Sequence, residues 1–160
     1  MTAVSFVVVV LDQLSKWLVL QNIARGEIIP VVPSFFNLTL TFNRGAAFGI
    51  LAGVPDGTRQ LLLGVTTLIA LSAVLYFLRK DYRDQKLAQF SLALIFGGAV
   101  GNIIDRFRLG EVVDFLDVYW QNYHWPAFNV ADSAICVGVC ILILRGNKSH
   151  ESAEKKAVEL

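Results

Sequence analysis

The chain has 160 residues, of which 55% are hydrophobic and only 17% are charged, and its formal net charge is +1. Roughly a quarter of the residues of an average soluble domain are charged, so this composition, with a mean hydropathy of +0.57, indicates that the chain is embedded in lipid. No basic block is interleaved with aromatic residues, which argues against a nucleic acid partner. The length allows about one domain, in which four spanning helices of ~20 residues would occupy half of the chain.

The first apolar segment, residues 3–20, is long enough to span a membrane. It lacks a basic leading region and a small-residue exit site, so we do not expect a cleaved signal peptide. Asp12 and Lys16 lie four positions apart, which places opposite charges on one helix face, where they partly neutralise each other in hydrocarbon. We interpret them as a structural ion pair rather than as a chemical site.

Residues 21–60 differ in character, because Pro30, Pro33 and Pro55 interrupt any helical pattern. Within them, residues 36–42 alternate between apolar and polar side chains, which predicts a strand with one apolar face. Such a face can rest on a membrane. The small residues among positions 43–49 would let a ligand approach the backbone closely.

Three further apolar segments are predicted to span the membrane: residues 61–78, 87–106 and 127–144. The third predicted span contains Gly97, Gly98 and Gly101, which permit close contact between helices in lipid. Residues 147–160 are polar and mixed in charge, and we expect a disordered tail there. We therefore expect one membrane domain, residues 1–146.

Basic residues predict the orientation of these spans. The link between the second and third spans and the tail after the fourth together carry eight lysines and arginines, against five on the opposite side. Because basic residues are enriched in cytoplasmic segments, both termini are expected to be cytoplasmic. Asp114 and Asp132 are thereby brought to the outer surface of the membrane.

A pair of carboxyl groups at one surface suggests a specific chemistry. Two carboxyl groups within hydrogen-bond distance tend to share one proton, so that one serves as a base and the other as an acid. Aspartic proteases use this arrangement to activate water against a peptide carbonyl. Such a site needs no metal, thiol or cofactor, and we expect none here.

Residue patterns alone do not decide which aspartates form the pair. The candidates near the outer surface are Asp105, Asp114, Asp117 and Asp132. Each also has a structural interpretation: an ion pair of Asp105 with its neighbour Arg106, ordinary loop acids for Asp114 and Asp117, and a helix-start acid for Asp132, with Asn129 as the N-cap. Five nearby aromatic residues can be interpreted as an interfacial belt: Tyr119, Trp120, Tyr123, Trp125 and Phe128.

Two other site classes are weaker. Cys136 and Cys140 lie within the last apolar segment and are interpreted as small apolar side chains. The two histidines, His124 and His150, belong to no cluster with metal-ligand spacing. We therefore predict no metal site.

Two alternative functions remain. Intramembrane acids also form proton relays in transporters, but here the acids gather at one surface, and no internal repeat is visible. A Ser/Lys peptidase using Lys16 is the other alternative. Its neighbour Ser15 points elsewhere on the helix, and Ser34 or Ser133 could approach only through the tertiary fold.

Five short motifs, taken together, resemble a known family. They are DQLSK at residues 12–16, NRGAAF at 43–48, GNIIDR at 101–106, VDF at 113–115 and FNVAD at 128–132. In this order and on four apolar spans, they closely resemble the lipoprotein signal peptidases, the signal peptidase II family of bacteria. The resemblance covers nearly the whole chain.

The resemblance implies an activity and a set of site residues. The activity is that of an intramembrane aspartyl endopeptidase, which removes the signal peptide from diacylglyceryl-modified prolipoproteins just before the lipid-bearing cysteine. Asp114 and Asp132 then become the catalytic pair. The positions that match residues holding the pair or contacting substrate are Asn43, Gly45, Ala46, Asn102, Arg106 and Asn129, and Asp12 with Lys16 match a pair that stabilises the helix core.

The resemblance also implies a fold and a location. The expected fold class is an all-α membrane protein, with four transmembrane helices, a small extracytoplasmic β-cradle at about 23–58 and a short periplasmic helix near 115–124. The expected location is the bacterial inner membrane, with the active site near its outer face. We expect a monomer whose partners are membrane lipid and prolipoprotein substrates.

Overall fold

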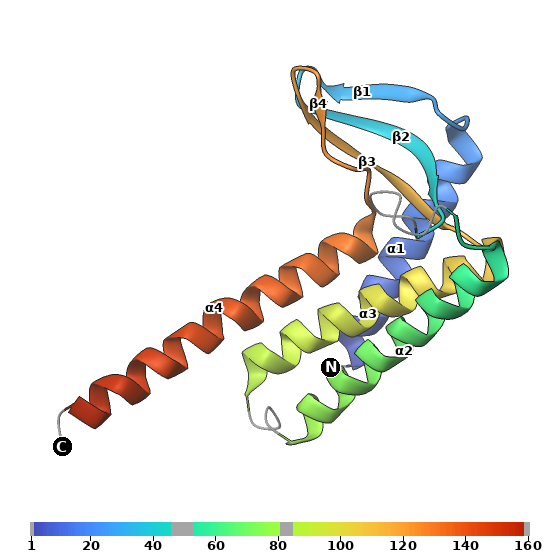
Figure 1. Ribbon diagram of the computed structural model, residues 1–160. Coiled ribbons are helices and arrows are strands. Elements are labelled where there is room, and N and C mark those ends of the chain that lie inside the picture. The colour runs from blue at the N-terminus through green and yellow to red at the C-terminus, as the bar shows by residue number, and fades with distance from the viewer. Residues whose placement is uncertain (1, 46–52, 81–84, 159–160) are drawn as a thin grey trace.

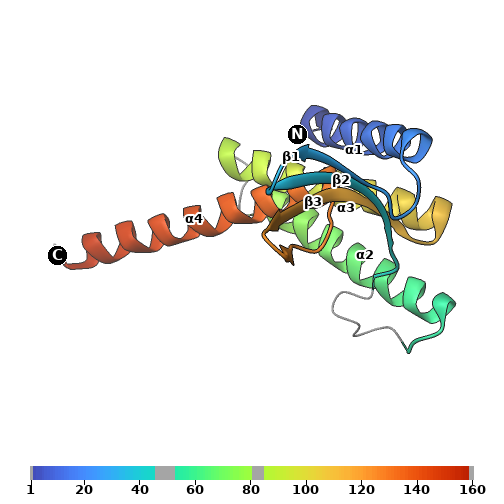
Figure 2. The ribbon, with the colours of Figure 1, turned by 90° about the horizontal axis from the view of Figure 1, so that it is seen from above.

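The computed structural model describes residues 2–45, 53–80 and 85–158, and the structure consists of four long helices and a small sheet. The helices are α1 (Thr2–Asn22), α2 (Asp56–Lys80), α3 (Lys86–Leu109) and α4 (Val130–Val158). The strands are β1 (Ile28–Val32), β2 (Phe36–Asn43), β3 (Val112–Trp120) and β4 (Tyr123–His124). The sheet lies at the end of the helices where α1 and α3 end and α2 and α4 begin (Figures 1 and 2).

Three helical segments within the described residues are long and apolar enough to cross a membrane: Thr2–Asn22, Gly57–Val74 and Lys86–Leu109. They correspond to the first three predicted spans. The fourth predicted span, residues 127–144, falls largely on α4, which begins at Val130. That α4 also crosses the membrane remains a prediction.

Glycine residues allow α3 to pack closely against its neighbours, as the small-residue pattern predicts. A Cβ atom on Gly98 would overlap the backbone carbonyl of Ala131 in α4. A Cβ atom on Gly101 would lie 2.6 Å from Asp12 Oδ2 of α1. Helices α1 and α4 therefore approach α3 at positions that only glycine leaves open.

The sheet is antiparallel, with strand order β1-β2-β3-β4. Its core is formed by Leu40 of β2 and by Val113 and Phe115 of β3, which pack with Val19 and Ile23 at the end of α1. The strand predicted at residues 36–42 is thus confirmed as β2. Because the core includes the end of α1, apolar packing holds the sheet against the helices in addition to the covalent connections of the backbone.

The short helix expected near residues 115–124 was wrong, because β3 and β4 occupy this stretch. Six of the nine residues of β3 are valine, phenylalanine, tyrosine or tryptophan, and these residue types favour strands. Pairing with β2 over a register from Phe36↔Val118 to Asn43↔Val112 satisfies the backbone hydrogen bonds that a helix would otherwise make internally. The β-cradle therefore draws strands from two distant parts of the chain.

The tail expected to be disordered, residues 147–160, overlaps the end of α4, and its disorder stays a prediction. Helix α4 continues to Val158, through most of the stretch for which the composition predicts disorder. Residues 151–157, ESAEKKA, are mostly strong helix formers.

Candidate active site

Asp114 is placed by the turn from α3 into the sheet. Gly110 ends α3 with a left-handed φ of 76°, and its N–H donates to the carbonyl of Arg106 at 3.1 Å. Strand β3 begins two residues later, so Asp114 lies just beyond the end of α3, opposite Thr41 of β2. Its side chain is buried, with 2% of the residue exposed.

Asp132 is placed by the start of α4. Asn129 precedes the helix, and its Oδ1 accepts the backbone N–H of Asp132 at 2.9 Å, which confirms the predicted N-cap. Asp132 consequently stands in the first turn of α4, where the helix dipole favours a negative charge.

Two asparagine side chains connect these carboxyl groups. Asn129 Nδ2 donates to Asp114 Oδ1 at 2.7 Å, and Asn102 Nδ2 donates to Asp132 Oδ1, also at 2.7 Å. Asn129 Nδ2 also lies 3.3 Å from Asn102 Oδ1. The tertiary structure thus links Asp114 and Asp132 through one continuous series of hydrogen bonds by way of Asn129 and Asn102, which we call the asparagine chain.

The environment of Asp114 favours its protonated form. Burial raises the pKa of Asp114 from 3.8 to about 6, and the negative charge of Asp132 contributes to the increase. The side chains of Asn43 and Asn129 and the charge of Lys16 lower this pKa, but by less. A carboxyl group with this pKa can hold a proton near neutral pH, as a general acid requires.

A buried charge cluster is connected to the two aspartates by hydrogen bonds. Lys16 Nζ forms ion pairs with Asp12 Oδ2 and Asp105 Oδ2, each at 2.8 Å, so the predicted Asp12–Lys16 pair is present. Because the helix packing brings α1 against α3, Asp105 has an ion-pair partner in Lys16 in addition to its electrostatic interaction with its sequence neighbour Arg106. Lys16 Nζ also donates to Asn102 Oδ1 at 3.1 Å, which leaves the amide group of Asn102 directed at Asp132.

The charge cluster also fixes the elements that carry the two candidate aspartates. Asp12 Oδ1 accepts the backbone N–H of Ala131 at 2.9 Å, and Asp105 Oδ2 accepts the backbone N–H of Val113 at 3.1 Å. Each of these N–H groups belongs to the residue immediately before a candidate aspartate. The cluster therefore helps to position Asp114 and Asp132 through the backbone.

Gln13 is a further member of the cluster, although it was not among the expected site residues. Its Nε2 lies 2.9 Å from Asp105 Oδ1 and 3.2 Å from both Asp12 Oδ2 and the Gly101 carbonyl. The signal that could have identified it is its position, because a polar side chain within a membrane span usually has a polar partner.

The remaining candidate residues lie around the same end of α3. Arg106 interacts electrostatically with Asp105, Asp114 and Asp132. Asn43 is the last residue of β2, and its Oδ1 accepts the N–H of Gly45 at 2.8 Å. Gly45 has a φ of 78°, and a Cβ atom there would overlap the side chain of Leu63. Ala46 lies outside the described residues.

Asp117 belongs to a separate cluster in the sheet. It accepts a hydrogen bond from Asn37 Nδ2 at 2.8 Å and lies 2.8 Å from Nδ1 of His124. The His124 ring stacks on Tyr119 with a centroid distance of 5.0 Å. Asp117 is therefore a buried strand residue with its own partners rather than a loop acid, and it is not connected to the asparagine chain.

The described residues contain no group of three or more His, Cys, Asp and Glu side chains that could hold a metal ion. What the site offers is a buried carboxyl group with a raised pKa beside a second carboxylate, with amide donors on both. Such a pair can activate a water molecule against a carbonyl group and stabilise the oxyanion that forms.

Known proteins resemble this chain in sequence and in structure. A family described as Signal peptidase (SPase) II matches residues 4–147. The lipoprotein signal peptidase of Geobacter metallireducens is 55% identical over 143 residues, covering 89% of this chain and 85% of the relative. That of Syntrophotalea carbinolica is 51% identical over 141 residues, covering 88% of this chain and 86% of the relative.

A solved structure described as a bacterial membrane enzyme determined by the in meso method superimposes with a TM-score of 0.85. It is 36% identical to this chain and covers 94% of it, and the match extends over 89% of the solved chain. The likeness therefore includes the helices and the sheet together.

Proposed function

Because the chain belongs to the signal peptidase II family and is accordingly a bacterial membrane protease that removes signal peptides from prolipoproteins, we propose that it works as an aspartyl endopeptidase with Asp114 and Asp132 as its catalytic pair. The observation that carries this proposal is the asparagine chain, in which Asn129 holds Asp114 and Asn102 holds Asp132, each at 2.7 Å.

The two carboxyl groups have different environments, which suggests a division of roles. Asp114 is buried and its pKa is raised to about 6, so it is the member that holds the proton. Asp132 stands in the first turn of α4, at the positive end of the helix dipole, and accepts an amide hydrogen bond from Asn102. Asp132 is thus the base and Asp114 the acid.

The reaction then proceeds in two steps, attack and collapse, and each step includes two proton transfers. Asp132 takes a proton from water as the water oxygen attacks the peptide carbonyl, while Asp114 donates its proton to the carbonyl oxygen. When the tetrahedral intermediate collapses, Asp132 delivers its proton to the leaving amine and Asp114 recovers one from the intermediate. The peptide bond is broken and both aspartates return to their initial state.

The position of the pair suits a substrate that arrives from lipid. Asp114 lies just beyond the end of α3, where the helix leaves the hydrocarbon region. The proposed substrate is a diacylglyceryl-modified prolipoprotein, whose lipid and apolar signal helix would hold the bond just before the modified cysteine at that level. Asn43, Gly45, Ala46 and Arg106 are proposed to contact the substrate, since they lie near the pair in space or in sequence.

The proposal also includes the domain, the orientation in the membrane and the oligomeric state of the enzyme. Residues 1–146 form the peptidase domain, α4 is the fourth transmembrane helix, both termini are cytoplasmic and the site faces the outer side of the inner membrane. The enzyme acts as a monomer and needs no cofactor, since two carboxyl groups supply all the proton transfers.

Cleavage by purified variants tests the proposed pair. Asp114→Asn and Asp132→Asn should each abolish cleavage of a lipidated precursor peptide in detergent, because neither can complete the proton transfers. Asp117→Asn is the matched control, since it alters another buried acid three residues along the same strand. Near-normal cleavage by either Asp114→Asn or Asp132→Asn in folded protein would overturn the assignment.

A further inference from the structure

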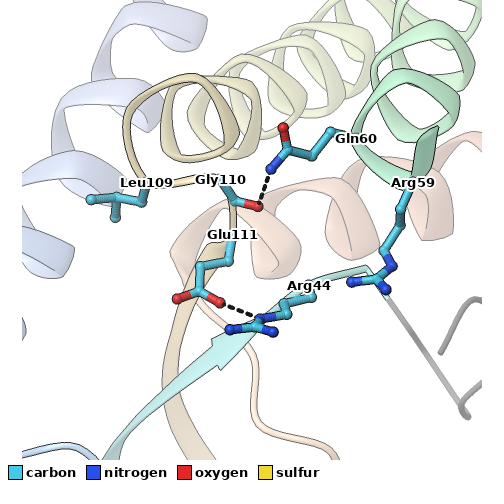
Figure 3. A pocket seen from close by; sticks show the side chains of 6 residues that line it. All are labelled: Arg44, Arg59, Gln60, Leu109, Gly110 and Glu111. Carbon is cyan, nitrogen blue, oxygen red and sulfur yellow. Dashed lines mark hydrogen bonds and ion pairs between the residues drawn. The ribbon is translucent and has the colours of Figure 1, made fainter. Parts of the chain in front are cut away.

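A cavity lies beside the candidate active site, where three elements meet. It has a volume of about 150 Å³ and is found between the end of β2, the first turn of α2 and the turn from α3 into β3 (Figure 3). The residues that line it are Arg44, Arg59, Gln60, Leu109, Gly110 and Glu111. None of them belongs to the proposed catalytic machinery.

Contacts among the lining residues hold the cavity in shape. Arg44 Nε forms an ion pair with Glu111 Oε2 at 2.9 Å, and Gln60 Nε2 donates to the Gly110 carbonyl at 3.2 Å. A guanidinium nitrogen of Arg59 donates to the Val54 carbonyl at 2.7 Å. Figure 3 shows the two arginines extending from different elements around the space next to Gly110. The cavity is therefore built jointly by β2, α2 and the α3–β3 turn.

The charge of the lining favours an anion. Two arginines and one glutamate leave one net positive charge on the six lining residues. Each guanidinium carries five N–H donors in a planar fork that matches the oxygen atoms of a phosphate group. Both arginines already make contacts within the protein, and the fork geometry allows a guanidinium to serve several acceptors at once. Glu111 adds an acceptor that suits a hydroxyl group on the same ligand.

The level of the cavity relative to the spanning helices indicates one source of a phosphate group. The cavity lies at the end of α3, Leu109, and at the start of the apolar segment of α2, Gly57. These are the positions where two spanning helices leave the hydrocarbon region, and phospholipid headgroups occupy that level. Basic pockets between transmembrane helices bind phospholipid headgroups on the cytoplasmic side of membranes, and the same charge complementarity applies to an anionic headgroup on the outer side.

We propose that this cavity is a binding site for a phosphate group, carried by an anionic phospholipid of the outer leaflet or present as free phosphate. Glu111 lies three residues before Asp114, and Arg44 directly follows Asn43. A bound phosphate would therefore connect α2 to the strand ends that frame the catalytic pair. The site is independent of the cleavage chemistry, so its test does not depend on the proposed aspartyl mechanism.

Binding by arginine variants tests the proposal, with the full chain purified in neutral detergent. Native mass spectrometry measures retained phosphatidylglycerol, and the thermal unfolding midpoint measures stabilisation by inorganic phosphate. Arg44→Gln and Arg59→Gln should weaken binding about tenfold each, as the loss of a charge-assisted hydrogen bond implies. Arg44→Lys, which keeps the charge but not the fork, should have an intermediate effect.

The matched control is Arg108→Gln, which removes the same charge from an exposed arginine in the last turn of α3, outside the cavity. Arg59 is largely buried, with 8% of the residue exposed, whereas 57% of the Arg44 side chain is exposed, so Arg44→Gln provides the test if Arg59→Gln does not fold. Loss of phosphatidylglycerol in the cavity variants alone supports a lipid headgroup site. Loss of phosphate stabilisation without any lipid retention supports a free-phosphate site. Equal binding by Arg44→Gln and the native chain, or an equal loss in Arg108→Gln, overturns the proposal.

Discussion

Replacing Asn129 by serine separates two functions of one side chain. Asn129 Oδ1 accepts the N–H of Asp132 at 2.9 Å, while its Nδ2 donates to Asp114 Oδ1 at 2.7 Å. Serine is as good an N-cap as asparagine and can keep the first contact. It has no amide group to make the second. Asn129→Ser therefore leaves the start of α4 capped and removes one donor from Asp114.

The sign and size of the effect follow from the contacts of Asp114. Hydrogen bonding by Asn129 lowers the pKa of Asp114 from what burial and Asp132 would otherwise produce, so its loss raises this pKa further above about 6. A hydrogen bond to a charged group contributes about 1.5–3 kcal/mol, and one pKa unit corresponds to about 1.4 kcal/mol. Since Asn43 and Lys16 still act on Asp114, we expect an increase of about one pH unit, at the lower end of that range.

The pH dependence of kcat/KM measures this shift. If Asp114 must be protonated, kcat/KM of the native chain falls as pH rises above about 6, and Asn129→Ser moves this fall to higher pH while lowering the maximum rate. A lipidated fluorogenic peptide in detergent, assayed on both sides of pH 6, provides the profile. Asn37→Ser is the matched control, because it removes an amide donor from Asp117 at 2.8 Å and leaves Asp114 untouched.

Two results would refute the reasoning. A native profile in which activity is lost as pH falls through about 6 would mean that Asp114 works as the ionised base. A profile of Asn129→Ser that coincides with the native one in pH would mean that the amide group does not act on Asp114, despite the 2.7 Å contact.

Three further predictions concern stability. The pKa of Asp114 rises from 3.8 in the unfolded chain to about 6 on folding, so between these pH values the folded state holds a proton that the unfolded state releases. The free energy of unfolding therefore falls as pH rises through this window, by up to about 3 kcal/mol. Asp114→Asn should raise the thermal midpoint at neutral pH and lose this advantage below pH 3.8. Lys16→Met leaves two buried carboxyl groups without their cation and should cost about 3–5 kcal/mol, seen as a lower thermal midpoint; a variant that folds normally but does not cleave would instead give Lys16 a part in the chemistry. Gly98→Val would drive a side chain into the Ala131 carbonyl and should cost at least about 1–3 kcal/mol, whereas Gly64→Val, at a position with nothing within 4 Å, should leave the midpoint unchanged.

Local sequence patterns predicted the features that local physics governs. Runs of apolar residues predicted the three helices that are long and apolar enough to span a membrane, because hydrocarbon thickness sets the length of such a run. Period-two alternation predicted β2, and the four-residue spacing of Asp12 and Lys16 predicted their ion pair. The cap of α4 by Asn129 was predicted from the two residue types and their positions.

Features that depend on distant partners could not be predicted in this way. Residues 115–124 were expected to form a helix, but β3 pairs with β2, which lies about 75 residues earlier, and no local signal in β3 reports that partner. An ion pair with its sequence neighbour Arg106 was one interpretation of Asp105, and only the approach of α1 to α3 adds Lys16 Nζ at 2.8 Å from its carboxylate. The separation of Asp114 from Asp117 came from family motifs, and the tertiary contacts then connected only Asp114 to Asn129.

The sequence by itself determined that this protein is built for a membrane, and it predicted Asp114 and Asp132 as a pair at one surface, because hydropathy, spacing and motif order are properties of the linear chain. Only the tertiary structure decided how these acids are held. Asn102 and Asn129 come from different elements, and their amide groups join Asp114 to Asp132 only after α3, α4 and the sheet have packed together. The raised pKa of Asp114 has the same origin, since burial and a neighbouring charge arise only when the folded chain excludes water from this carboxyl group.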